Sequence, residues 1–150
     1  MKQLTWIPIL FLLASVAHAD EAKATAAILK KDGKAHATQF TDAIRVNIRP
    51  ELRDELAPIV AAIRHAENGR AGREYGILHK KALGKSYRTQ AGWAAATVQR
   101  QYDRWVKAGK KGTYLESLAR RYCPVGADND PTGLNKHWLK NVTHFTKKFD

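Results

Sequence analysis

The sequence predicts a mostly α-helical single domain that follows an export signal. In its second half, apolar residues recur at spacings of three and four, as they do along one face of a helix. No run of alternating apolar and polar residues is longer than a few positions, so no strand is predicted. Removal of the signal would leave 131 residues, which is enough for one domain with a real core and too few for two.

Residues 1–19 have the organisation of a secretory signal peptide. Lys2 precedes an apolar stretch from Leu4 to Val16, and Ala17-His18-Ala19 is a small-x-small cleavage site. The apolar stretch is too short to anchor stably in a bilayer core of about 30 Å. We therefore expect a mature chain that begins at Asp20, has no stable membrane span, and is periplasmic or secreted.

The chain is strongly basic, with 26 Lys and Arg residues against 14 Asp and Glu residues. The net charge is +12, or +11 once Lys2 leaves with the signal peptide. Such an excess predicts an anionic partner. Export argues against nucleic acid, whereas a bacterial envelope offers anionic polymers and peptide carboxylates. The basic residues are spread along the chain, so no single tract marks a binding arm.

Cys123 is the only cysteine. An exported chain with one cysteine has no internal disulfide, so its stability must come from packing. Cys123 precedes Pro124 and has no base pattern nearby, which favours a partly buried structural thiol over a nucleophile.

Residues 20–49 are predicted to be a loosely ordered N-terminal segment, and residues 50–150 the helical domain. Pro58 interrupts the first helical pattern of that domain, and a proline inside a helix costs about 3 kcal/mol. The helix either kinks there or, as we prefer, a second helix begins with Pro58 in its first turn and ends near Glu67. The apolar face of the pattern consists of Leu52, Leu56, Ile59, Val60 and Ile63.

Three further helices are expected after residues 69–88, which show no clear periodicity. Thr89 can cap the first of them, whose apolar stripe leads to Gly109. A capping box at Thr113-Tyr114-Leu115-Glu116 opens the second, and Pro124 ends it. The last helix is defined by apolar residues four, four, three and four positions apart: Leu134, Trp138, Val142, Phe145 and Phe149.

Glu67 is the strongest catalytic candidate. It lies in the last turn of a predicted apolar helix, which Asn68-Gly69 should end. The partial negative charge of a helix C-terminus and the apolar surroundings both disfavour an ionised carboxylate, so the pKa of Glu67 should rise. A carboxyl group that stays protonated near neutral pH can act as a general acid. The alternative is a solvated glutamate at a helix end.

The segments Ala66-Glu67-Asn68-Gly69 and Tyr75-Gly76-Ile77-Leu78-His79 together resemble the active-site region of the lysozyme-like superfamily, in particular soluble lytic transglycosylases. The stretch from residue 122 to 138 is similar to the C-terminal part of peptidoglycan hydrolases and glucosaminidase-like proteins. The resemblance covers about residues 55–145. His79 stands where the family has Gln, and the Ala-Tyr-Asn-Ala-Gly motif of many lytic transglycosylases is absent.

The resemblance implies a lysozyme-like fold and cleavage of peptidoglycan glycan strands, of the lytic transglycosylase or of the muramidase or glucosaminidase type. Glu67 would be the general acid, and Tyr75, Gly76, His79 and Tyr122 would bind substrate. Hydrolases of this kind need a second carboxylate, whereas lytic transglycosylases use groups of the substrate itself. The candidates for a second carboxylate stay open: Glu74, Asp103, Glu116, Asp128 and Asp130.

Other functional classes have weaker support in the sequence. No spacing of His, Cys or carboxylate residues matches a zinc site, and no Gly-x-Ser-x-Gly elbow is present. We expect a monomer without metal or cofactor. The remaining rival is a non-catalytic basic envelope protein that binds an anionic cell-wall polymer. Trp105, Trp138, Phe145 and Phe149 are expected to pack in the core, and Trp93 is placed there as well. Trp93 is also one of the aromatics that could stack on sugar rings, which are Tyr75, Tyr87, Trp93, Tyr114 and Tyr122.

Overall fold

The computed structural model describes residues 19–149. These residues form six α-helices and two 3-10 helices without a strand, which confirms the mostly α-helical class. The predicted signal peptide, apart from Ala19, lies outside the described residues. Across residues 19–149, no helix combines the length and the apolar character that crossing a membrane requires. The elements are α1 (Ala19–Asp32), α2 (Lys34–Asn47), η1 (Pro50–Leu52), α3 (Arg53–Glu67), α4 (Tyr87–Lys107), α5 (Tyr114–Tyr122), η2 (Leu134–His137) and α6 (Trp138–Phe149).

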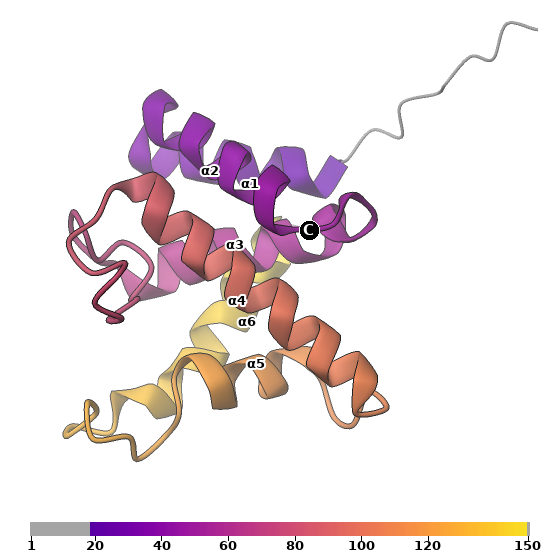
Figure 1. The fold of residues 1–150 in the computed structure, drawn as a ribbon, viewed down its shortest axis with the longest axis vertical. Coiled ribbons are helices and arrows are strands. Elements are labelled where there is room, and N and C mark those ends of the chain that lie inside the picture. Colours follow the sequence, from indigo (N-terminus) through magenta and orange to yellow (C-terminus); the bar gives the residue numbers. More distant parts are fainter. Residues whose placement is uncertain (1–18, 150) are drawn as a thin grey trace, which may run out of the picture.

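Helix α3 is the centre of the structure. Every residue from Leu56 to Arg64 is buried, so this part of the helix is covered on all sides. It packs against α1, α4 and α6. Figure 1 shows α1 and α2 side by side at one end of the molecule and α5 at the other, with α6 running from that end back towards α1. Glu67, the last residue of α3, lies three residues beyond the buried stretch.

Helix α3 runs through Pro58 without a break, so the preferred prediction of a new helix at this residue is wrong. The proline removes one backbone hydrogen bond near the start of the helix, at a cost of about 3 kcal/mol. Full burial of a large aliphatic side chain contributes about 1.5–3 kcal/mol, and Leu56, Val60 and Ile63 are all fully buried. Tertiary packing thus offsets the cost of the proline.

The prediction of a loosely ordered segment at 20–49 is also wrong. This segment forms α1 and α2, which pack against each other, while α1 also packs on α3 and α2 on α4. Ile28, Phe40 and Ile44 are fully buried. The backbone N–H groups of Asp20 and Glu21 donate to Oδ1 of Asp54 on α3, at 3.2 and 3.1 Å. These bonds supply the acceptor that an isolated helix N-terminus lacks.

The start of α5 agrees with the sequence prediction, and the starts of α4 and of the last helix differ from it. Ser86, rather than Thr89, caps α4, and its side chain accepts from the backbone N–H of Thr89. The capping box at Thr113 and Glu116 is confirmed at the start of α5. The predicted last helix begins as the 3-10 helix η2 and becomes α-helical at Trp138.

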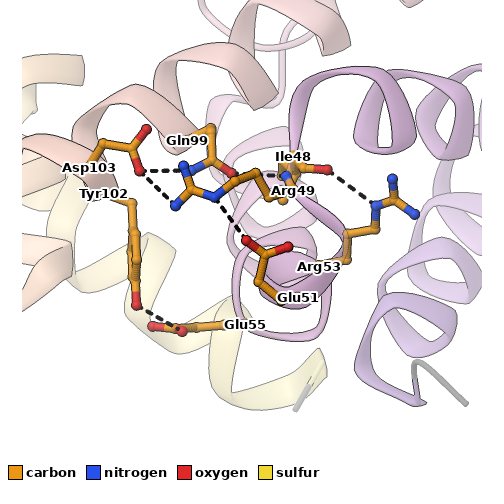
Figure 2. A network of polar contacts seen from close by, with 8 residues as sticks. All are labelled: Ile48, Arg49, Glu51, Arg53, Glu55, Gln99, Tyr102 and Asp103. Atoms are coloured by element: carbon orange, nitrogen blue, oxygen red, sulfur yellow. Dashed lines mark hydrogen bonds and ion pairs between the residues drawn. The ribbon is translucent and has the colours of Figure 1, made fainter. Parts of the chain in front are cut away.

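A polar network ties the connection between α2 and α3 to α4 (Figure 2). The guanidinium group of Arg49 contacts Asp103 at 2.9 Å and Glu51 at 3.1 Å. The backbone N–H of Arg49 donates to Gln99 Oε1 at 3.1 Å, and Gln99 in turn donates to Asp103. The network fixes the chain just before α3 begins, and it occupies one of the carboxylates that were candidates for catalysis.

Candidate functional site

Glu67 is held at the end of α3 by a side chain from α6. The helix ends where predicted, because Asn68 adopts the left-handed conformation with a φ of 47°. The indole Nε1–H of Trp138 donates to Glu67 Oε1 at 2.8 Å, across 71 positions of sequence. Trp138 was predicted to be a core residue, and it is buried, but its polar edge fixes the carboxyl group. The helical spacing that predicted a core position for Trp138 gives no signal of what its indole N–H binds.

Gly76 lies directly against the Glu67 carboxyl group. A Cβ atom at Gly76 would stand 2.3 Å from Oε2 and 2.4 Å from the carboxyl carbon of Glu67, so only glycine leaves room for this contact. Gly76 also has a φ of +67°, which side chains of L-residues rarely adopt. The predicted pairing of the Glu67 and Gly76 segments is therefore present in the structure, although Gly76 contacts the acid itself.

Burial raises the pKa of Glu67 above its usual value, and the hydrogen bond from Trp138 lowers it in part. The direction agrees with the sequence prediction. Burial is the main cause, because α6 and the 69–86 segment cover a side chain that would otherwise be exposed to water at the end of α3. A carboxyl group that is desolvated in this way retains its proton to a higher pH, as a general acid requires.

A pocket of about 590 Å³ opens beside Glu67; we call it the Glu67 pocket. Its volume lies in the range of sites that bind small molecules or sugar units. Polar side chains from the η2–α6 segment make up much of its wall, and among residues 19–149 Glu67 is the only carboxylate in it. The lining residues are Ala66, Glu67, Cys123, Leu134, Asn135, His137, Trp138, Lys140 and Asn141.

A second pocket of about 280 Å³ lies on the Gly76 side; we call it the His79 pocket. The His79 ring stacks on Trp93, with ring centroids 4.8 Å apart. Trp93 is therefore a wall of this pocket and not the core residue that was predicted. His79 and Gly76 both line it, as predicted for substrate-binding residues. The lining residues are Gly76, Ile77, Leu78, His79, Trp93, Thr97, Arg121, Tyr122 and Asn129.

Tyr122 connects the two pockets. Its ring lines the His79 pocket and stacks on Trp138 at 5.3 Å, while Trp138 lines the Glu67 pocket. The Tyr122 hydroxyl donates to the backbone carbonyl of Tyr75 at 2.6 Å. Burial raises the pKa of this hydroxyl well above its usual value, so it stays a neutral donor. Tyr122 therefore offers a ring face to the pocket and holds the segment that carries Gly76.

Tyr75 does not line either pocket, so the prediction that it contacts substrate is wrong. Its side chain is fully buried, and its hydroxyl lies 3.0 Å from that of Tyr87. Tyr87 donates in turn to Asp32, which forms an ion pair with Arg64 at 2.8 Å. Tyr75 thus anchors the 69–86 segment to α4, α1 and α3. Its buried ring also contributes more to stability than an exposed ring would.

Gln90 closes the base of the same segment. Its fully buried Nε2 donates to the backbone carbonyl of Gly72 at 2.8 Å and also to that of Ala82. The N–H of Gly84 donates to the same Gly72 carbonyl at 3.0 Å. The segment without periodicity is therefore a loop with a fixed neck. Sequence reasoning missed Gln90, because a glutamine inside a helix gives no signal of what it binds.

None of the predicted candidates for a second carboxylate lines either pocket. Asp103 is paired with Arg49, and Glu116 accepts from the backbone N–H of Thr113 at 2.9 Å. Asp130 accepts from the N–H groups of Leu134 and Asn135 at 2.7 and 3.1 Å. These bonds have structural roles. Of the other two candidates, Glu74 is buried and Asp128 is exposed.

Cys123 lines the Glu67 pocket as a thiol. Burial raises its pKa to about 11, and the nearby Glu67 adds to this shift. The Sγ–H group lies 2.9 Å from Asn135 Oδ1, which accepts its hydrogen bond. A thiol with so high a pKa is a poor nucleophile near neutral pH. The structure therefore supports the predicted structural role.

Across residues 19–149, no three His, Cys, Asp or Glu side chains come together in a way that could hold a metal ion. Comparison with protein-family models, with curated proteins and with solved structures gives no significant match.

Proposed function

We propose that this protein cleaves the glycan strands of peptidoglycan outside the cytoplasm, with Glu67 as the general acid. The observation that carries the proposal is the desolvated Glu67 carboxyl group, fixed by Trp138 between two pockets. Cleavage of a glycosidic bond needs a proton at the leaving oxygen and stabilisation of positive charge on the sugar. Glu67 suits the first requirement, and the resemblance of its segment to lytic transglycosylases agrees with this role.

The lytic transglycosylase reaction fits this pocket better than hydrolysis. A retaining hydrolase needs a second carboxylate about 5–5.5 Å away and an inverting one about 6.5–9.5 Å away. In the part of the chain that the structure describes, Glu67 is the only carboxylate that lines either pocket. In the proposed reaction Glu67 protonates the glycosidic oxygen as its bond to the anomeric carbon breaks. A hydroxyl group of the sugar that carries this anomeric carbon then bonds to the carbon. The hydroxyl proton passes to Glu67, and the product is an anhydro-sugar.

Mass analysis of fragments released from purified peptidoglycan tests this function. We expect anhydro-sugar ends, which are lighter by one water than hydrolysed ends. Glu67→Gln keeps the shape of the side chain and removes its transferable proton, so cleavage should fall by roughly 10²-fold or more. Cys123→Ser, on the wall of the same pocket, is the matched control and should retain most of the activity. Undiminished cleavage by folded Glu67→Gln protein would remove Glu67 from the mechanism.

The rival is a non-catalytic protein that binds an anionic cell-wall polymer, and the net charge of +12 favours it. Binding through many surface charges weakens steeply with salt, because charges are screened beyond about 8 Å at 0.15 M. Retention on peptidoglycan that disappears at moderate salt, with no fragments released at any salt, would support this rival against the enzyme.

A further inference from the structure

Lys140 is a cation without a counter-ion on the wall of the Glu67 pocket. Its side chain is exposed, and it forms no ion pair with any carboxylate of residues 19–149. Glu67 shares the pocket, where burial raises its pKa and the hydrogen bond from Trp138 lowers it in part; Lys140 is not among the causes of the shift. The ammonium group of Lys140 is therefore available to a ligand.

Lys140 is the third residue of α6, whose first turn carries no acidic residue. The helical segment begins upstream at η2, where Asp130 already accepts from the N–H groups of Leu134 and Asn135. An anion in the Glu67 pocket would therefore interact with the ammonium group of Lys140 itself.

The His79 pocket has a cation in the corresponding role. Arg121 lines this pocket from the end of α5, is exposed, and likewise pairs with no carboxylate among the described residues. Its planar guanidinium group can bind a carboxylate through two parallel hydrogen bonds. Each of the two pockets therefore has one exposed cation on its wall, and the Glu67 pocket also contains the acid.

We infer that Lys140 and Arg121 bind carboxylates carried by the glycan strand on the two sides of the bond that is cut. This inference rests on the proposed function and adds a specificity to it, namely preference for an acidic glycan over a neutral polymer of N-acetylglucosamine. Two sources supply that chemistry in peptidoglycan. One is the lactyl carboxylate of peptide-free strands, and the other is a carboxylate of the peptide stem.

The test measures binding by the Glu67→Gln protein, which leaves the ligands uncut. Titration calorimetry would compare a neutral oligomer of N-acetylglucosamine with peptide-free and with peptide-bearing strands of the same length. We expect about fivefold to tenfold tighter binding of the acidic strands, where a tenfold change corresponds to 1.4 kcal/mol. Preference for the peptide-free strands over the neutral oligomer identifies the lactyl group as the ligand, and preference for the peptide-bearing strands alone identifies the stem.

Charge-matched variants separate the site from the general charge of the protein. Lys140→Gln in the same background should remove most of the preference, whereas Lys34→Gln, in the first turn of α2 and on neither pocket, should not. Arg121→Gln and Arg104→Gln, which lies in the last turn of α4, form the second pair. Equal binding of acidic and neutral oligomers, no binding of either, or equal losses from Lys140→Gln and Lys34→Gln would overturn the inference. Failure of the proposed function shows separately, as wild-type protein that releases no fragments.

Discussion

Asp32 and Glu67 are both the last residue of a helix, α1 and α3, where the helix dipole disfavours a negative charge. The two carboxylates have different partners. Asp32 accepts from Nε and Nη2 of Arg64, both at 2.8 Å, and from the Tyr87 hydroxyl at 3.0 Å. Glu67 accepts from Trp138 and shares its pocket with an unpaired lysine. The compensated carboxylate joins three helices, and the uncompensated one is the proposed general acid.

The two acids are also connected. Arg64, which holds Asp32, lies one helical turn before Glu67 on α3. Tyr87, which also holds Asp32, contacts Tyr75, and Tyr75 is the neighbour of the glycine on which Glu67 rests. The compensated acid therefore supports the geometry of the uncompensated one. Changes at Asp32 should affect stability first, whereas changes at Glu67 should affect rate and pH dependence first.

Removal of the Asp32 partner should have the largest effect. Arg64→Met leaves a buried carboxylate without its cation, so the free energy of unfolding should fall by about 3–5 kcal/mol. Chemical denaturation measures this loss. Arg88→Met is the control, because Arg88 forms an exposed pair with Asp42 at 3.6 Å and such pairs contribute about 0–1 kcal/mol. Similar losses in the two variants would contradict the role assigned to the Asp32 pair.

Gly76→Ala should have the next largest effect, and it should appear in the cleavage rate. The added methyl group would displace the Glu67 carboxyl group from Trp138, and a misplacement of about 1 Å can cost about 10²-fold in rate. Gly84→Ala is the matched control, since Gly84 has a similar φ of +73° but open space where a Cβ would lie. Both variants should lose stability from backbone strain, by about 1 kcal/mol. If Gly84→Ala loses as much activity as Gly76→Ala, the contact with Glu67 is not the cause.

The Trp138→Phe and Tyr87→Phe variants each remove one donor to a carboxylate, and they should differ in what they change. Trp138 lowers the pKa of Glu67, so Trp138→Phe should raise this pKa and move the alkaline limb of the pH–rate profile to higher pH. Tyr87→Phe should lower the free energy of unfolding by about 1–2 kcal/mol. Cleavage rates from pH 4 to 9 check the first expectation. A limb that stays in place in Trp138→Phe would contradict it.

The smallest expected effect is a pH-dependent gain of stability in Glu67→Gln. Because burial raises the pKa of Glu67 above its usual value of 4.5, folding favours the protonated form, and the wild type loses stability as pH rises from that value through the folded pKa. Glutamine does not titrate, so the variant should be relatively more stable above that pH and similar below it. Thermal melts at several pH values measure the difference.

Glu116→Gln serves as the opposite case. Hydrogen bonds from Thr113 lower the pKa of Glu116, so its contribution to stability is present above the usual value of 4.5 and is lost as pH falls through the folded pKa. The difference between this variant and the wild type should therefore have the reverse sign at neutral pH. Equal pH dependence of the two variants would show that Glu67 is not desolvated in the folded protein.

Local signals in the sequence were enough for several features. The left-handed Asn68 ends α3 after Glu67, and the capping box at Thr113 opens α5. Both depend on residues within one turn of the helix end, so neighbours in sequence contain the necessary information. The direction of the pKa shift of Glu67 was also predicted, from the helix end and the apolar residues before it, although the burial that raises this pKa involves α6 and the 69–86 segment.

Features that depend on remote partners were not predictable in this way. The sequence of α1 and α2 is rich in alanine and has few large anchors, and isolated helices of about 14 residues are marginal in water. Contacts with α3 and α4 stabilise them. The continuity of α3 through Pro58 has the same cause, since burial against neighbouring helices outweighs a local penalty.

The sequence by itself determined which residue could act as an acid and where its helix ends. Tertiary structure alone decided what surrounds that acid: Trp138 across 71 positions, Gly76 beneath the carboxyl group, and Lys140 and Arg121 in the two pockets. The physical reason is the separation in sequence between the residues that interact. Helix ends depend on backbone hydrogen bonds between near neighbours, whereas desolvation and charge at a site depend on side chains that only the packing of α5, α6 and the 69–86 segment brings together.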